Sequence, residues 1–210
     1  MNISKKALWI SLGAVILAVA YYFIFIHPSR NDIANLDSEG TNIVAFGDSL
    51  VFGYGSSDGH DFVSLLSQRI GRPIINLGHS GDTTADGIAR MDHIFTHDPK
   101  LVIVLLGGND YLHRVPIDTT FANLDKIVTT IQQHGAAVLL LGIRGGLLYD
   151  SYDSRFKSFV RDHKVGFVPN VLDGLLGDAR VMYDSIHPND AGYVKVADKV
   201  EPVLRRMLSK

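Results

Sequence analysis

Short apolar runs, separated by polar and turn-forming segments, recur along most of this chain. The runs at 101–106 and 136–141 are apolar throughout, which is typical of strands buried on both faces of a parallel sheet. Shorter apolar runs of the same kind complete a set of five predicted strands. The predicted strands lie at 42–46, 73–77, 101–106, 136–141 and 166–168.

Between these runs, apolar residues recur every three or four positions, as Ile88, Met91 and Phe95 do. This spacing is typical of amphipathic helices. The predicted helices lie at 61–70, 84–95, 120–131, 154–163 and 191–208, the last with Val194, Ala197, Val200 and Leu204 on its inner face. Strands that alternate with helices imply right-handed crossovers, so the sequence predicts an α/β fold with a five-stranded parallel sheet between two helical layers.

The first 26 residues break this alternation. Residues 7–26 carry no charge, and 20 helical residues at about 1.5 Å each cover roughly the 30 Å hydrocarbon core of a bilayer. Lys5 and Lys6 precede this segment and no acidic residue accompanies them, so residues 1–6 are expected to stay cytoplasmic. The sequence therefore predicts a transmembrane anchor at 7–26.

The anchor places the rest of the chain outside the cytoplasm, in the periplasm or at the cell exterior. Residues 27–41 are polar and without period, which predicts a linker, and residues 42–210 form the predicted domain. The alternative is a secreted protein, because Ala18-Val19-Ala20 has the form of a signal-peptidase site. We favour the anchor, since the apolar run exceeds the usual signal core of about 7–15 residues.

Composition narrows the chemistry that the domain performs. The 20 Lys and Arg residues face 22 Asp and Glu residues, and no basic run recurs, so a nucleic-acid partner is not expected. The absence of cysteine excludes disulfides, a thiolate nucleophile and Cys-ligated metal sites. His93 and His97 have metal-ligand spacing on a predicted helix, but no Glu follows His93, which favours a solvated helix face.

Polar, glycine-rich segments follow four of the predicted strands, where a parallel sheet binds its ligands. These segments are Gly47-Asp48-Ser49, the stretch 78–82, Gly107-Gly108-Asn109-Asp110 and Arg144. None is a complete dinucleotide-binding loop, P-loop or lipase-type nucleophile elbow.

A serine with a distant His and Asp remains as the candidate chemistry. A serine hydroxyl needs an imidazole to take its proton, and the imidazole needs a carboxylate on its other nitrogen. Ser49 follows the first strand, and Asp184 stands three residues before His187 near the C-terminus. Gly81 and Ser49 offer backbone N–H groups, and Asn109 offers a side-chain amide, for an oxyanion hole.

These segments resemble, in order, the four signature blocks of the GDSL or SGNH hydrolases. The blocks are Gly47-Asp48-Ser49-Leu50, the Gly81 of Ser80-Gly81-Asp82-Thr83, Gly107-Gly108-Asn109-Asp110 and Asp184-x-x-His187. The resemblance runs from about residue 42 to the C-terminus, and within the family it is to small bacterial esterases of the thioesterase I, lysophospholipase L1 and arylesterase type.

The resemblance implies a flavodoxin-like sheet and a site that uses no metal or other cofactor. It implies Ser49 as nucleophile, His187 as base and Asp184 as the acid that orients it. The implied oxyanion hole consists of the N–H groups of Ser49 and Gly81 and the side chain of Asn109.

The sequence thus predicts a serine esterase that cleaves small-molecule or lipid acyl esters through an acyl-serine intermediate. An acyltransferase, an envelope-glycan deacetylase and a non-catalytic acyl- or sugar-binding module are the alternatives. Five residues near the predicted rim are expected to contact substrate: Tyr54, His79, Arg144, Leu147 and Tyr149. Arg144 is followed by Gly145-Gly146, where related enzymes often have Pro. This loop is expected to lie over the acyl site, so the resemblance does not define the chain-length preference.

Overall fold

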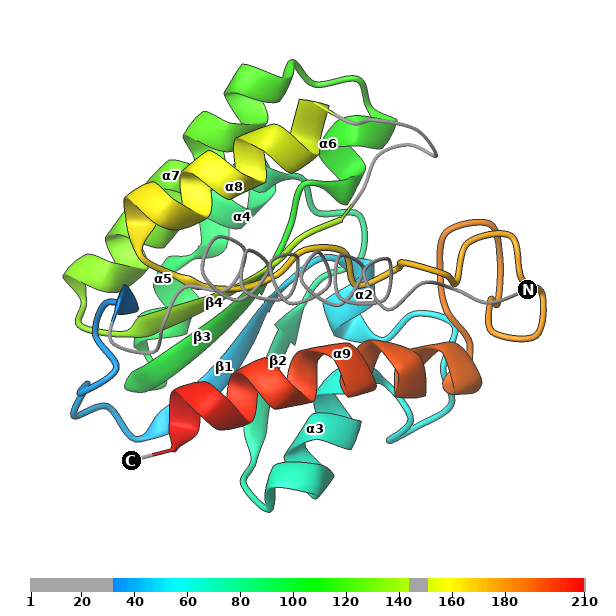
Figure 1. The fold of residues 1–210 in the computed structure, drawn as a ribbon, viewed down its shortest axis with the longest axis horizontal. Coiled ribbons are helices and arrows are strands. Elements are labelled where there is room, and N and C mark those ends of the chain that lie inside the picture. The colour runs from blue at the N-terminus through cyan, green and yellow to red at the C-terminus, as the bar shows by residue number, and fades with distance from the viewer. Residues whose placement is uncertain (1–31, 144–150, 210) are drawn as a thin grey trace, which may run out of the picture.

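A computed structural model describes residues 32–143 and 151–209 of the 210-residue chain. Its centre is a five-stranded sheet in the order β2-β1-β3-β4-β5, with every neighbouring pair parallel (Figure 1). The strands are β1 (Asn42–Gly47), β2 (Ile74–Gly78), β3 (Pro99–Leu105), β4 (Ala137–Leu141) and β5 (Gly166–Val168). The predicted five-stranded parallel sheet is confirmed, and its order is the flavodoxin-like one.

Helices cover both faces of this sheet. The helices α3 (Phe62–Ile70) and α9 (Asp190–Leu208) pack on one face (Figure 1). The other face carries α4 (Thr84–Arg90), α5 (Asp92–Phe95), α7 (Ile117–Gln133) and α8 (Ser151–His163). The predicted three-layer α/β/α architecture is therefore confirmed.

The continuous apolar runs follow from this double cover. In β3, Leu101, Ile103 and Leu105 join the core beneath α3 and α9. Val102 and Val104 alternate with them and join the core beneath α7 and α8. Because successive side chains point to opposite faces, a strand covered on both sides must be apolar at every position.

Two short helices begin within three residues of a strand end and were not predicted. They are α2 (Ser49–Phe52), after β1, and α6 (Gly108–Leu112), after β3. The helix expected at 84–95 is interrupted at Met91, which separates α4 from α5 and stays buried.

One residue of the terminal helix was assigned to the wrong face. Val194 is 37% exposed, whereas Tyr193, Val196, Ala197 and Val200 are buried. The inner stripe of α9 begins at Tyr193, and the next residue along a helix lies about 100° away from it, which turns Val194 toward solvent.

The described end of the expected linker, residues 32–41, packs against the domain. Ile33 is buried in the core. The Asn35 side-chain amide donates to the carbonyl of Ala136, just before β4, and Lys100 in β3 donates its ammonium to a carbonyl of this segment. The segment is therefore docked at the amino ends of the strands, because it carries an apolar side chain that the domain buries.

The expected anchor at 7–26 lies outside the described residues. Within 32–143 and 151–209, no helix combines the length and the apolar character that crossing a membrane requires.

Candidate active site

Ser49 is the first residue of α2, at a sharp turn from strand to helix. Asp48 caps this helix, with its Oδ1 accepting a hydrogen bond from the Leu50 N–H at 3.0 Å. Gly47 has no room for a side chain, because a Cβ there would lie 2.2 Å from the carbonyl oxygen of Leu105. The close approach of β1 and β3 thus fixes the turn that presents Ser49 at the carboxyl edge of the sheet.

Three predicted residues form one hydrogen-bonded chain. Ser49 Oγ lies 2.9 Å from His187 Nε2, and His187 Nδ1 lies 2.8 Å from Asp184 Oδ2. The other carboxylate oxygen of Asp184 accepts the backbone N–H groups of Ile186 and His187, at 2.9 and 2.7 Å. In this arrangement the imidazole can take the hydroxyl proton while the carboxylate fixes its tautomer.

The environment of Asp184 suits a charged orienting group. Desolvation raises the pKa of this carboxyl, but hydrogen bonds from the His187 ring and from the N–H groups of Ile186 and His187 outweigh it. The pKa of Asp184 therefore lies below its ordinary value, and the carboxyl is ionised at neutral pH.

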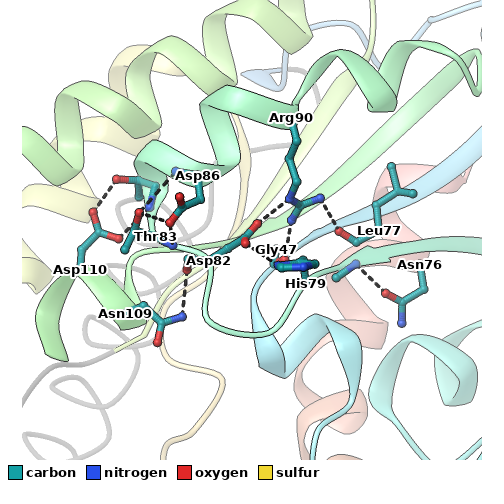
Figure 2. Close-up of polar contacts among 12 residues, drawn as sticks. Gly47, Asn76, Leu77, His79, Asp82, Thr83, Asp86, Arg90, Asn109 and Asp110 are labelled. Atoms are coloured by element: carbon teal, nitrogen blue, oxygen red, sulfur yellow. Dashed lines mark hydrogen bonds and ion pairs between the residues drawn. The ribbon is translucent and has the colours of Figure 1, made fainter. Parts of the chain in front are cut away.

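The predicted oxyanion donors other than Ser49 belong to the loop after β2 and to α6, and Asn109 shares a pocket with Ser49 and His187. Gly81 adopts a left-handed conformation, with φ of 91°, in the loop after β2. Asn109, in α6, donates one N–H of its amide to the carbonyl of Asp82 at 2.9 Å (Figure 2). An amide carries two N–H donors, so this bond orients the group and leaves the second N–H available.

Two buried carboxylates brace these donors. Asp82 is 5% exposed and its Oδ1 lies 2.7 Å from Nδ1 of His79. Asp110 accepts the N–H of Thr84 at 2.8 Å and its hydroxyl at 2.5 Å, and the hydroxyl of Thr120 at 3.3 Å. These bonds fasten α6, which carries Asn109, to α4 and α7.

An apolar pocket of about 150 Å³ opens beside Ser49 and His187. Its wall is formed by residues that follow β3 and β4, by α6 and α8, and by the loop before α9. Six of its apolar lining residues are Tyr111, Leu112, Ile143, Tyr152, Leu172 and Leu176. A hydrocarbon chain bonded to a carbonyl at Ser49 fits such a wall, because burial of apolar surface is favourable.

The structure brings Ser49, His187 and Asp184 together, but it places neither Tyr54 nor His79, two of the predicted substrate contacts, in the pocket. The Tyr54 ring centroid lies 4.6 Å from that of His187, so Tyr54 flanks the imidazole rather than lining the pocket. His79 is bonded to Asp82 and is also not among the pocket residues. The other three predicted contacts, Arg144, Leu147 and Tyr149, lie outside the described residues.

Sequence reasoning missed most of the pocket. Tyr111 and Leu112 are 44% and 49% exposed, and they directly follow the polar Asn109-Asp110 pair. This apolar pair within a polar segment was the sequence feature that could have indicated the pocket. Leu172 and Leu176 carried no comparable signal, because they follow the last strand in a segment without period.

Asp48 is a further residue whose environment the sequence did not reveal. It lines the pocket yet is only 2% exposed. Burial raises its pKa to about 7, the Leu50 N–H opposes this rise, and the nearby carboxylates of Asp82 and Asp110 add to it. A carboxyl that changes charge near neutral pH therefore lies next to Ser49 in the sequence.

Comparisons with known proteins show what this chain is similar to. The model of the GDSL-like Lipase/Acylhydrolase family matches residues 45–195. Esterase TesA of Pseudomonas aeruginosa is 30% identical over 178 residues, which cover 79% of this chain and 89% of that protein. An arylesterase of Vibrio mimicus is 29% identical with the same coverage.

A third relative and one solved structure extend the comparison. The thioesterase 1/protease 1/lysophospholipase L1 of Escherichia coli is 27% identical over 176 residues, covering 80% of this chain and 85% of that protein. A crystal structure of TesA, 30% identical, superimposes with a TM-score of 0.71 over 80% of this chain and 100% of that one.

Proposed function

This chain belongs to the GDSL-like lipase/acylhydrolase family and is an esterase of that family, and on that premise we propose that Ser49 is its nucleophile and forms an acyl-serine intermediate. The family that the sequence motifs indicated is thereby confirmed. The observation that carries the proposal is the chain of hydrogen bonds from Ser49 through His187 to Asp184 at the mouth of an apolar pocket.

The proposed reaction has two halves. Ser49 Oγ bonds to the ester carbonyl carbon while its proton passes to Nε2 of His187. The C–O bond to the alcohol then breaks, and the alcohol leaves with that proton. A water molecule repeats the sequence, giving its proton to His187, releasing the acid and restoring Ser49. Asp184 stabilises the imidazolium that forms in each half.

The negative charge that develops on the carbonyl oxygen needs donors that are already in place. We assign this role to the backbone N–H groups of Ser49 and Gly81 and to the free amide N–H of Asn109. The bond from Asn109 to the carbonyl of Asp82 supports this assignment, because it holds the amide in one orientation before substrate arrives.

The site supports an acyl ester as substrate. The apolar wall suits the acyl chain, and Tyr54 beside His187 is close to where the leaving alcohol would depart. Relatives are named arylesterase and thioesterase/lysophospholipase, which agrees with acyl transfer from varied leaving groups to water.

A fluorophosphonate probe tests the nucleophile directly. Wild-type protein is expected to be labelled and Ser49→Ala is not. Ser158→Ala removes a half-buried hydroxyl on α8, which bonds to the carbonyl of Arg155, and is the matched control, expected to label like the wild type. Equal labelling of Ser49→Ala, or no labelling of the wild type, would show that the serine mechanism is wrong.

We also propose that residues 7–26 anchor the esterase domain outside the cytoplasm. The position of the described segment 32–41 limits how such an anchor could orient the domain relative to the membrane. It is docked at the amino ends of the strands, whereas Ser49 lies at the carboxyl end of β1. Only residues 27–31 separate it from the proposed anchor, and five residues reach at most about 18 Å.

An anchored domain would therefore turn the amino ends of its strands toward the membrane and Ser49 away from it. In that orientation the esters that reach the site come from the aqueous side or from a layer beyond it. This favours short acyl esters and acylated envelope glycans over lysophospholipids of the bilayer that holds the anchor.

A further inference from the structure

Arg90, at the end of α4, lies at the centre of a network of hydrogen bonds with Asp82, Leu77 and Gly47 (Figure 2). Its Nε donates to Asp82 Oδ2 at 2.5 Å. Its two terminal nitrogens donate to the carbonyls of Leu77 at 2.9 Å and Gly47 at 2.8 Å. The guanidinium carbon also lies 4.2 Å from the centroid of the Phe46 ring. Every nitrogen of the guanidinium thus has a partner.

This network is largely shielded from water. The side chain of Asp82 is 6% exposed and that of Arg90 is 21% exposed. A buried carboxylate needs a paired charge, and a planar guanidinium supplies charge and three directed donors together. A lysine ammonium at this position would be a single point charge that replaces only part of these bonds.

Two of the partners of Arg90, Gly47 and Asp82, lead to the three donors of the proposed oxyanion hole. Gly47 ends β1 two residues before Ser49, so its carbonyl fixes the turn that carries the Ser49 N–H. Asp82 directly follows Gly81, and the Asp82 backbone carbonyl accepts the Asn109 amide. One side chain therefore ties together the three places from which the donors come.

We propose that Arg90 is a positioning residue of the oxyanion hole, holding the β1 turn, the loop after β2 and, through Asp82, the Asn109 amide in one arrangement. The inference rests on the proposed function of Ser49 and adds to it. Arg90 touches no reacting atom. Its effect on the rate is indirect. Donors that are already held in place stabilise the charge of the transition state without a cost in free energy for reorienting them during the reaction.

The proposal predicts a loss that is specific to the transition state. Arg90→Gln is expected to lower kcat by about 10- to 100-fold, since small misplacements of catalytic groups cost up to about 100-fold. The KM for a p-nitrophenyl ester is expected to change less than about threefold, because the acyl pocket does not involve Arg90.

Affinity for a boronic acid, which mimics the tetrahedral intermediate at a serine, is the second measurement. It is expected to fall in parallel with kcat, while affinity for the carboxylic acid product stays unchanged. A merely structural role would not separate these two ligands. Arg90→Lys keeps the charge and is expected to recover part of both quantities.

Arg69→Gln is the matched control. Arg69 joins α3 to α9 through ion pairs with Asp198 and Glu201, at 2.8 and 3.1 Å, away from the site. Its removal is expected to leave kcat and boronic-acid affinity at wild-type values.

Asp82→Asn keeps the backbone carbonyl that Asn109 uses and removes the charge that Arg90 holds, so it serves if Arg90→Gln fails to fold. It is expected to show the same selective loss of kcat. Folded Arg90→Gln, or in its absence folded Asp82→Asn, with wild-type kcat and boronic-acid affinity would overturn the positioning role. That outcome is distinct from failure of Ser49 to label with the fluorophosphonate, which would overturn the proposed function itself.

Discussion

Ser49 Oγ and His187 Nε2 lie 2.9 Å apart although 138 positions separate them in the chain. The loop after α2 makes this possible by packing on the loop that carries His187. Tyr193, in α9, donates its hydroxyl to the carbonyl of Tyr54 at 2.8 Å. A Cβ on Gly55 would lie 2.7 Å from the carbonyl oxygen of Pro188, so glycine is needed at this contact. The proposed triad is therefore held by the packing around it as well as by its own hydrogen bonds.

Removal of the imidazole or of its orienting carboxylate tests the triad. His187→Ala is expected to lower kcat for a p-nitrophenyl ester by about 10⁶-fold, and Asp184→Asn by about 10⁴-fold through the wrong imidazole tautomer. His97→Ala, at the amino ends of the strands, is expected to keep wild-type rates. Retained activity in His187→Ala would assign the base to another residue.

Truncation of the amide tests the oxyanion hole. Asn109→Ala is expected to lower kcat by about 10²- to 10³-fold, or about 2.7–4 kcal/mol, with KM little changed. Its bond to the Asp82 carbonyl is also lost, so thermal unfolding is measured alongside. A change in kcat of less than twofold would remove Asn109 from the hole.

The apolar pocket is expected to select acyl chain length. Each buried methylene contributes about 0.8 kcal/mol, so kcat/KM is expected to rise roughly fourfold per carbon until the pocket is full. Ile143→Phe fills space at the wall and is expected to move the optimum to chains shorter by about two carbons.

A series of p-nitrophenyl esters of increasing length measures this profile. Val194→Phe places the same ring on the exposed face of α9 and serves as the control. An identical profile for Ile143→Phe and the wild type would mean that the acyl chain lies elsewhere.

The carboxyl of Asp48 is expected to give stability a distinct pH dependence. Its pKa is raised from 3.8 to about 7 in the folded protein. Between about pH 4 and 7 the folded state therefore binds a proton that the unfolded state has released, so the free energy of unfolding falls as pH rises through this window. The loss amounts to about 4 kcal/mol at most.

Asp48→Asn removes this titration and can keep the acceptor for the Leu50 N–H. Urea unfolding at several pH values is expected to show the variant gaining on the wild type from pH 4 to 7. Asp58→Asn, an exposed carboxyl, is the control. A wild-type minus Asp48→Asn difference that is constant with pH would contradict the raised pKa.

The proposed orientation of the anchored domain is tested by lengthening its tether. In proteoliposomes, the full chain is expected to cleave a soluble short ester readily and a lysophospholipid of the same bilayer slowly. About 30 Gly and Ser residues inserted before Asp32 span roughly 30 Å and are expected to raise lysophospholipid cleavage several-fold, with the soluble ester unaffected.

Equal cleavage of both substrates by the unmodified chain would contradict this orientation. Carbonate extraction tests the anchor itself. Recovery of a shortened protein wholly in the supernatant would show that the N-terminal segment is a cleaved signal peptide and not an anchor.

The strands were predictable because each contains an apolar run, which can be recognised from neighbouring residues alone. The run at 101–106 corresponds to β3, shifted by one or two residues at its ends. The helices α2 and α6 were not, because four or five residues are shorter than the window in which helical periodicity appears. The side chain of Asp48 caps α2, whereas Gly107 precedes α6 in a left-handed conformation and makes no side-chain cap.

By itself the sequence determined the α/β fold, the order of strands and helices, and the family, through residues whose chemistry is tied to short motifs such as Gly47-Asp48-Ser49 and Asp184-x-x-His187. Only the tertiary structure decided that Arg90 reaches the ends of β1 and β2 and the loop after β2, that residues 32–41 dock at the amino ends of the strands, and that Leu172 and Leu176 line a pocket. The reason is physical. Periodicity and turn chemistry act between neighbours in the chain, whereas these contacts join segments that only the packing of the whole core brings together.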